Sequence, residues 1–205
     1  MSITEILNTL LELPFTTNYV TEWKHEQLIA ATLAETGISF VRHPFGKKDV
    51  DFLVQVADSY WVILEAKSSS RNNFPDLFNT YAAEGIYIFC STQQELNQTT
   101  LFLGASVMSD EQRASYDNFI EDIDTIRKKY QAMPGWTEYD AGEWNYVVER
   151  RIDHTKGTDL FSEDQRDRNE QLVFDTCNAV GLLDEVPHYV RNGYNIVKLH
   201  EIDLD

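Results

Sequence analysis

The sequence predicts a single α/β domain in which helices flank a mixed central β-sheet. Apolar residues recur at helical spacing near both ends of the chain, and runs rich in β-branched and aromatic residues lie between them. No repeat, low-complexity tract or Pro/Gly/Ser-rich linker divides the 205 residues. Because 42% of the residues are hydrophobic and 12% are aromatic, a chain of this length can bury one sizeable core.

Two helices are expected before the first strand. The first covers residues 2–13, where the apolar residues at helical spacing are Ile3, Ile6, Leu7, Leu10 and Leu11, and it stops before Pro14. The second covers residues 22–35 and ends before Gly37, because glycine commonly follows the last turn of a helix. One side of this helix is expected to carry Trp23, Gln27, Ala30, Ala31 and Ala34.

The middle of the chain is expected to form the sheet. Its strands are residues 38–41, 50–56, 60–66, 86–90 and 99–103. A turn over residues 46–49 precedes the second strand, and Ala57-Asp58-Ser59 would join the second and third strands as a hairpin. Residues 86–90, Ile-Tyr-Ile-Phe-Cys, are continuously apolar and therefore suit a buried central strand.

The C-terminal half is expected to add two helices and two strands. One helix spans residues 109–130, with acidic residues opposite an apolar side made of Phe119, Ile120, Ile123 and Ile126. A strand over residues 144–152 follows it. The next helix spans residues 162–183, with Ser162 or Asp164 as its N-cap, and turns inward Leu172, Val173, Cys177 and Val180. The tail from Tyr194 would form a closing strand.

Composition argues against secretion, membrane insertion and a zinc site. Glu5 and Glu12 stand where a signal peptide would be basic and then apolar, and no run of about 18 apolar residues occurs. A cytoplasmic location and no membrane partner are therefore expected. Cys90 and Cys177 are far apart and outside any Cys/His cluster, which predicts two core residues rather than a disulfide or zinc ligands.

The residues that suggest chemistry are Asp51, Glu65 and Lys67. Side chains alternate along a strand, so Glu65 and Lys67 share one face while Leu64 and Ala66 take the other. If the hairpin forms, Asp51 lies near them. Carboxylate oxygens suit Mg²⁺, which could neutralise a phosphodiester and activate water, and a neighbouring lysine could orient the water or stabilise developing charge.

These residues resemble the PD-(D/E)XK nuclease superfamily, here as Val50-Asp51 followed by Glu65-Ala66-Lys67, with valine where the motif has proline. The resemblance covers roughly residues 22–103, and the approach to Asp51 from Arg42 is similar to that of type II restriction endonucleases. It implies a restriction-endonuclease-like core over about residues 20–105, with Mg²⁺ on Asp51 and Glu65. It also implies cleavage of double-stranded DNA at a short sequence, and a homodimer.

The resemblance further implies a fourth catalytic acid on the preceding helix, for which Glu26 is preferred and Glu22 is next. Residues 109–205 would then serve DNA recognition or dimerisation. His25 and His43 are expected at the surface or behind the ligands, because Mg²⁺ favours oxygen. Asp51, Glu65 and Lys67 are each expected at an exposed strand edge, so that alanine substitutions abolish cleavage without disturbing the fold.

DNA contacts are expected from polar and basic residues around the motif and from one basic group farther along the chain. These residues are Lys47, Lys48, Ser69, Ser70, Arg71, Asn72, Asn73, Arg150 and Arg151. The alternative for residues 68–73 is an ordinary polar loop. Gln98-Thr99-Thr100 allows the same two interpretations, whereas Arg127-Lys128-Lys129 matches the cationic end of a helix without any partner.

The net charge of −17 is unusual for a DNA-binding protein. Residues 1–75 contain six basic and nine acidic residues, whereas residues 76–205 contain eleven and 25, so the repulsive charge is mostly C-terminal. Three alternatives to a restriction enzyme stay open. They are a repair or recombination nuclease that recognises DNA structure, a catalytic subunit that borrows DNA affinity from a partner, and a non-catalytic binding protein with a degenerate site.

Overall fold

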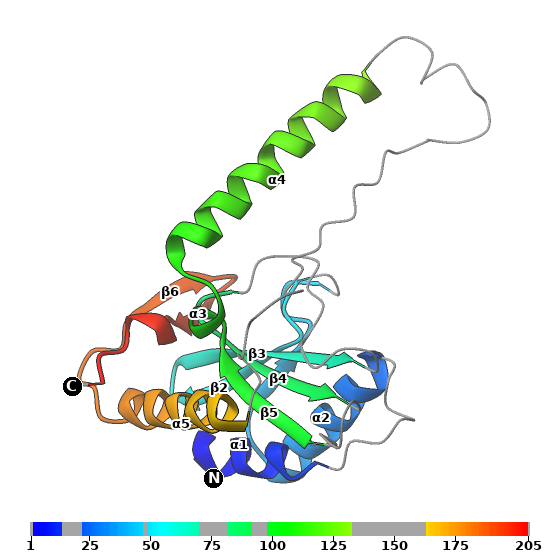
Figure 1. Cartoon of the computed structure of the whole chain (residues 1–205). Coiled ribbons are helices and arrows are strands. Elements are labelled where there is room, and N and C mark those ends of the chain that lie inside the picture. Colours follow the sequence, from blue (N-terminus) through cyan, green and yellow to red (C-terminus); the bar gives the residue numbers. More distant parts are fainter. Residues whose placement is uncertain are drawn as a thin grey trace.

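A computed structural model of the chain describes residues 2–13, 22–46, 49–69, 82–91, 98–132 and 163–204. The order of elements is α1 (Ile3–Leu11), α2 (Glu22–Thr36), β1 (Phe40–Arg42), β2 (Phe52–Ala57), β3 (Tyr60–Ser69), β4 (Gly85–Ser91), β5 (Gln98–Leu103), α3 (Gly104–Val107), α4 (Asp110–Gln131), α5 (Glu163–Val180), β6 (His188–Arg191), β7 (Tyr194–Val197) and a 3₁₀ turn (Leu199–Glu201). The fold is therefore the expected α/β class, with a mixed open sheet flanked by helices (Figure 1).

The sheet is mixed because β3 pairs in parallel with both β4 and β7, whereas the other strand pairs are antiparallel. Strands β1 to β5 follow one another across it, with β1–β2, β2–β3 and β4–β5 antiparallel and β3–β4 parallel. The start of β3 also pairs with β7, which pairs with β6. The expected hairpin between β2 and β3 and the buried strand of residues 86–90 are thus confirmed.

The main core lies where α1, α2 and α5 meet one face of the sheet. The expected inward residues of α1 and α5 are confirmed, with Ile6, Leu7, Leu10 and Val173 fully buried. Of the residues expected along one side of α2, Ala30 packs partly buried against the core, whereas Gln27, Ala31 and Ala34 are exposed. Among the described side chains of this helix, the buried ones are His25, Ile29, Thr32 and Leu33. Larger aliphatic side chains bury more apolar surface than alanines and therefore set the helix orientation.

A second cluster fills the other face of the sheet. It contains Val50, Leu53, Ile63 and Ile196. The β6–β7 hairpin supplies much of this cover, and it was not expected beyond a closing strand. Its turn, Asn192-Gly193, has positive φ at both residues, 49° and 85°, as two-residue hairpins of this kind require.

The β6–β7 hairpin also fixes the segment between β1 and β2. Arg191 forms a bidentate ion pair with Asp49, and its guanidinium lies 3.8 Å from the centroid of the Phe45 ring. Because these contacts hold the segment that leads into Asp51, the C-terminal strands help to position the residues predicted for chemistry. Residues 144–152, expected as a strand, and Ser162, a possible N-cap, lie outside the described residues.

Helix α4 projects from the body of the protein as an arm (Figure 1). Ser109 begins it with a capping box, in which its hydroxyl accepts from the Gln112 backbone N–H and the Gln112 side chain accepts from the Ser109 backbone N–H. None of its residues is buried. Among the helices of the described segments, none combines the length and apolar character that a membrane span requires.

Candidate metal centre

Asp51 and Glu65 face each other at the open end of the β2–β3 hairpin. The register pairs Phe52 with Leu64, so the preceding Asp51 stands beside Glu65. The Asp51 backbone N–H donates to Glu65 Oε2 at 3.0 Å, and the Ala66 N–H donates to Asp51 Oδ2 at 2.9 Å. The hairpin therefore brings together the two carboxylates that strand alternation alone could not join.

Glu65 and Lys67 lie on the same face of β3, as expected. The alternate residues Leu64 and Ala66 belong to the main core, and Ile63, on the same face as Glu65, belongs to the cluster on the opposite side of the sheet. Burial raises the pKa of Glu65 well above its ordinary value, and the neighbouring Asp51 raises it further, whereas the positive charge of Lys67 lowers it. The charge of Lys67 thus acts directly on the carboxyl group beside it.

Asp51 is not at an exposed edge, contrary to expectation. Its residue exposure is 9%, and its side chain satisfies a buried backbone N–H of Ala66. An alanine at position 51 would leave that N–H unpaired, at a cost of about 1–3 kcal/mol. Asp51→Asn, which keeps an acceptor oxygen, is therefore a better test of chemistry than Asp51→Ala.

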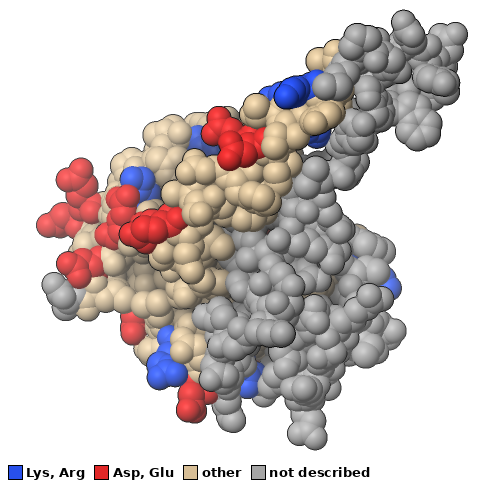
Figure 2. Space-filling view, turned by 45° about the horizontal axis from the view of Figure 1, so that its top comes forward, with Lys and Arg blue, Asp and Glu red and all other residues tan. Residues whose placement is uncertain are grey.

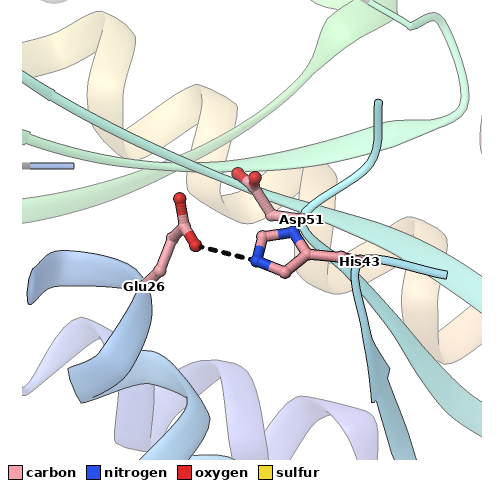
Figure 3. Close-up of side chains that lie close together, drawn as sticks. All are labelled: Glu26, His43 and Asp51. Carbon is pink, nitrogen blue, oxygen red and sulfur yellow. Dashed lines mark ion pairs between the residues drawn. The ribbon is translucent and has the colours of Figure 1, made fainter. Parts of the chain in front are cut away.

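Glu26 reaches the same place from helix α2, which agrees with its choice as the helix acid. One ligand atom each from Glu26, His43 and Asp51 lie within 4.8 Å of one another (Figure 3). Arg42 donates to Glu26 Oε2 at 2.8 Å, and His43 Nε2 lies 3.4 Å from the same oxygen. The side chain of Glu22, the second choice, lies outside the described part.

His43 is the member of this group that sequence reasoning placed behind the ligands or at the surface. It has φ of 49°, an uncommon backbone conformation for a residue other than glycine. Its backbone N–H donates to the Asp51 carbonyl at 2.8 Å, which ties the histidine to the aspartate. The only sequence signal was a histidine in the approach to the motif, and its ring direction depends on a backbone angle that the sequence does not reveal.

His25 is buried rather than at the surface, with 1% exposure, on the helical turn that carries Glu26. Its Nε2 lies 3.1 Å from the Cys90 sulfur, which also lies 3.1 Å from Thr99 Oγ1. Burial lowers the pKa of His25 to about 4, with Asp51 opposing this change and Lys67 adding to it. His25 is therefore neutral near pH 7 and supports the site from the core side.

The expected DNA-contacting residues cannot be placed around this centre. Lys47, Lys48, Ser70, Arg71, Asn72, Asn73, Arg150 and Arg151 lie outside the described residues, as does the side chain of Ser69 at the end of β3. Thr99 and Thr100 were a weaker suggestion, and both are buried in β5 with 6% and 4% exposure. They face the protein interior and are not available to a nucleic acid.

The donor set fits a divalent cation. Asp51, just before β2, and Glu26, on α2, supply converging carboxylates, and Glu65 on β3 contacts the Asp51 backbone beside them; hard oxygen donors of this type suit Mg²⁺. Apposed buried carboxylates repel one another, and a bound cation would relieve this repulsion. Comparisons with protein-family models, with curated proteins and with solved structures find no match to this chain.

Proposed function

We propose that the protein is a Mg²⁺-dependent endodeoxyribonuclease that hydrolyses phosphodiester bonds, with a centre formed by Asp51, Glu65, Lys67 and Glu26. The observation that carries the proposal is the contact between Asp51 and Glu65 across the hairpin end, with Lys67 next along the same face of β3. A pair of facing carboxylates beside a lysine is the set that metal-assisted phosphodiester hydrolysis needs.

Asp51 and Glu65 would hold the cation, and Glu26 would complete or support their oxygen donors. When bound, the cation would neutralise phosphate charge and lower the pKa of a coordinated water. Lys67 would orient the attacking water or stabilise the charge that develops on the phosphoryl oxygens. Three hydrogen bonds of 2.8–3.0 Å would keep this geometry before substrate arrives: the Asp51 backbone bonds to His43 and to Glu65 Oε2, and Asp51 Oδ2 accepts from the Ala66 N–H.

Double-stranded DNA cut at a short sequence is the proposed substrate, and a restriction-endonuclease-like core and a homodimer belong to the same proposal. Support comes from the motif resemblance and from the nearly balanced charge around it, because residues 41–73 contain five basic and four acidic residues. The net charge of −17 favours a second candidate, a catalytic subunit that obtains DNA affinity from a basic partner protein.

The purified chain incubated with supercoiled plasmid and Mg²⁺ tests the proposal. We expect cleavage, and we expect Asp51→Asn, Glu65→Gln and Lys67→Met each to lower its rate at least about 100-fold. Lys198→Met is a matched control, because Lys198 pairs with Glu201 at 2.7 Å and not with the proposed centre. Wild-type rates in any of the three variants would remove that residue from the proposal.

Sequencing the ends of the cleaved DNA separates the candidates. Cuts at one short sequence support a restriction enzyme, whereas cuts at branches or ends support a structure-specific nuclease. Absence of cleavage by the chain alone, followed by cleavage with a basic partner protein added, supports the subunit candidate. Absence of cleavage under both conditions, with either Mg²⁺ or Mn²⁺, overturns the proposed nuclease activity.

A further inference from the structure

We propose that His43 supplies a nitrogen ligand to the metal centre and makes it selective for a first-row transition ion, represented by Mn²⁺, over Mg²⁺. This inference rests on the proposed metal centre but not on its proposed reaction. Mg²⁺ is held by carboxylates, water and substrate oxygens, whereas imidazole suits first-row transition ions; Mn²⁺ shares the carboxylate ligands of Mg²⁺ and, as such an ion, can also accept the imidazole nitrogen. A histidine among the ligands would therefore change which ion the centre prefers.

The geometry supports one ion shared by three donors. The ligand atoms of Glu26, His43 and Asp51 all lie within 4.8 Å of one another. Donors bound to one ion at about 2.0–2.6 Å cannot be more than about 5 Å apart, so the three fit around one ion with only small adjustment. They come from α2, from the segment after β1 and from the start of β2, so tertiary structure rather than local sequence brings them together.

The backbone at His43 gives an independent reason to assign it a role. Its φ of 49° precedes Pro44, a position that normally favours extended backbone. Strained residues of this kind persist where the surroundings fix them, and they cluster at ligand sites. Here the His43 backbone N–H donates to the Asp51 carbonyl at 2.8 Å, and this hydrogen bond holds the histidine beside the aspartate. Its Nδ1 is buried and has no hydrogen-bond partner within the described residues.

Arg42 defines the competing explanation, in which these side chains form only an ion-pair network. It donates to Glu26 Oε2 at 2.8 Å, and the same oxygen lies 3.4 Å from His43 Nε2. A network of this kind would balance the negative charge of Glu26 without any metal ion. It predicts no His43-dependent cation binding, whereas a metal centre predicts binding that weakens when the imidazole is removed.

Mn²⁺ binding to the full chain without DNA distinguishes the two explanations. Titration followed by the electron paramagnetic resonance of free Mn²⁺ gives affinity and stoichiometry, and modulation from a coordinated ¹⁴N nucleus reports the imidazole directly. The test variant is His43→Asn, because asparagine tolerates positive φ and lacks the ring nitrogens. His200→Asn is the matched control, since that imidazole lies 3.8 Å from Glu201 instead.

We expect one Mn²⁺ site, a ¹⁴N signal lost in His43→Asn, and at least about a tenfold loss of Mn²⁺ affinity with little change for Mg²⁺. Absence of the ¹⁴N signal, or equal Mn²⁺ affinity in His43→Asn and wild type, overturns the inference even if the chain cleaves DNA with Mg²⁺. Conversely, His43-dependent Mn²⁺ binding without any DNA cleavage keeps the inference and overturns the nuclease proposal.

A separate observation concerns helix α4, whose apolar side chains form a seam. The seam residues recur at alternating spacings of three and four, as in a coiled coil, and are Tyr116, Phe119, Ile123, Ile126 and Tyr130. Phe119 and Ile126 are each 56% exposed and Tyr130 is 47% exposed. Large apolar residues in such a row are normally covered by another helix with the same repeat.

We infer that a second copy of this chain covers the seam with its own α4 in the antiparallel direction. Helix α4 carries six acidic residues from Asp110 to Asp124 and then Arg127, Lys128 and Lys129. Figure 2 shows basic side chains toward the far end of the arm and acidic ones nearer the body. Antiparallel helices place the acidic part of each against the basic end of the other and also oppose their dipoles.

One antiparallel register satisfies both the apolar and the charged positions. Phe119 then lies across from Tyr130 of the second copy, and Ile123 lies across from Ile126. In the same register Asp122 flanks the seam opposite Lys129 of the second copy. In coiled coils, salt bridges between residues at such flanking positions determine which helices pair and in which direction. The apolar spacing and the flanking charges therefore agree on one self-complementary pairing.

Sedimentation of the full chain from low to high micromolar concentration tests this pairing. We expect a reversible dimer that Phe119→Ser and Ile126→Ser abolish; both positions are exposed, so the folded monomer should survive. Lys129→Glu should weaken the dimer, and Asp122→Lys together with Lys129→Glu should restore it. A monomer at all concentrations, a dimer insensitive to the seam variants, or failure of the double exchange to restore it would overturn the antiparallel pairing.

Discussion

Two buried groups beside the candidate centre are expected to give opposite pH dependence to stability. Burial lowers the pKa of His25 to about 4 from 6.5, so its neutral form stabilises the fold above pH 6.5, and this stability is lost as pH falls toward 4. Burial raises the pKa of Glu65 above 4.5, so its protonated form stabilises the fold below pH 4.5, and this stability is lost as pH rises.

The size of each effect follows from proton linkage. The His25 shift, from 6.5 to about 4, corresponds to about 3 kcal/mol of unfolding free energy, at about 1.4 kcal/mol per pKa unit. Between pH 4.5 and 6.5 the unfolded chain protonates His25 and ionises Glu65, whereas the folded chain keeps His25 largely neutral and holds the Glu65 proton to higher pH than the unfolded chain does. The two slopes oppose each other, so the pair together should contribute less pH dependence than either group alone.

Substituting either group should reveal the pH dependence of the unfolding free energy that the other group contributes. In Glu65→Gln the unfolding free energy should rise with pH relative to wild type. In His25→Gln it should fall, by up to about 2 kcal/mol between about pH 5 and pH 6.5. Urea unfolding with a chelator present measures this, and the range stays above the pI of about 4.5, where solubility is lowest. Other titrating groups contribute equally and cancel in the comparison.

The double variant is the internal control. Substituting both groups should give a pH slope between those of the two single variants, because both opposing contributions are then removed. If Glu65→Gln and His25→Gln instead change the slope in the same direction, or not at all, the assignment of opposite protonation states in the folded protein is wrong. Destabilisation that is equal at every pH would report packing alone.

Two further predictions concern packing. Gly104→Ala should lower the unfolding free energy by about 1–3 kcal/mol or more, because an added Cβ would stand 1.9 Å from the Ala82 carbonyl oxygen. Gly181→Ala should change it much less, because the nearest atom to the added Cβ would be 3.5 Å away. Urea unfolding of the two variants compares these effects. Cys90 and Cys177 are free and buried, and burial raises the pKa of each thiol to about 12. Both thiols should therefore react with a disulfide reagent only after unfolding. Rapid reaction of the native protein would contradict their burial.

The fold class and most elements could be predicted because the apolar patterns were strong. Helix α1 has a clear helical period and strand β4 is continuously apolar, and the structure places both as expected. Helix α2 has a weak pattern, in which three alanines accompany three large aliphatic residues, so its buried side depended on the packing of Ile29 and Leu33 in the core. Pairing of β3 with β4 continues to Ser69, which extends β3 beyond the residue at which its apolar pattern stops.

The candidate site could be predicted in part for the same physical reason. Strand alternation and a short hairpin determine where Glu65, Lys67 and Asp51 lie, and these are local rules. The position of His43 depends on a left-handed backbone angle and on a carbonyl of Asp51, neither of which leaves a sequence pattern. Glu26 could be chosen only through resemblance, because its approach to Asp51 depends on how α2 packs on the sheet.

The energetics of the hairpin end favour a ligand over a purely structural role. Asp51 and Glu65 meet where the pairing of β2 with β3 ends, and the paired residues beside them, such as Leu53 and Ile63, are apolar and buried. Burying facing carboxylates lowers stability unless a proton or a cation compensates, and apolar residues of similar size would complete the strands without that cost. Lys67 compensates only part of the charge, since the pKa of Glu65 stays raised beside it. A divalent cation would remove the remaining repulsion, so the same residues that lower the stability of the metal-free protein are the ones expected to bind the ion.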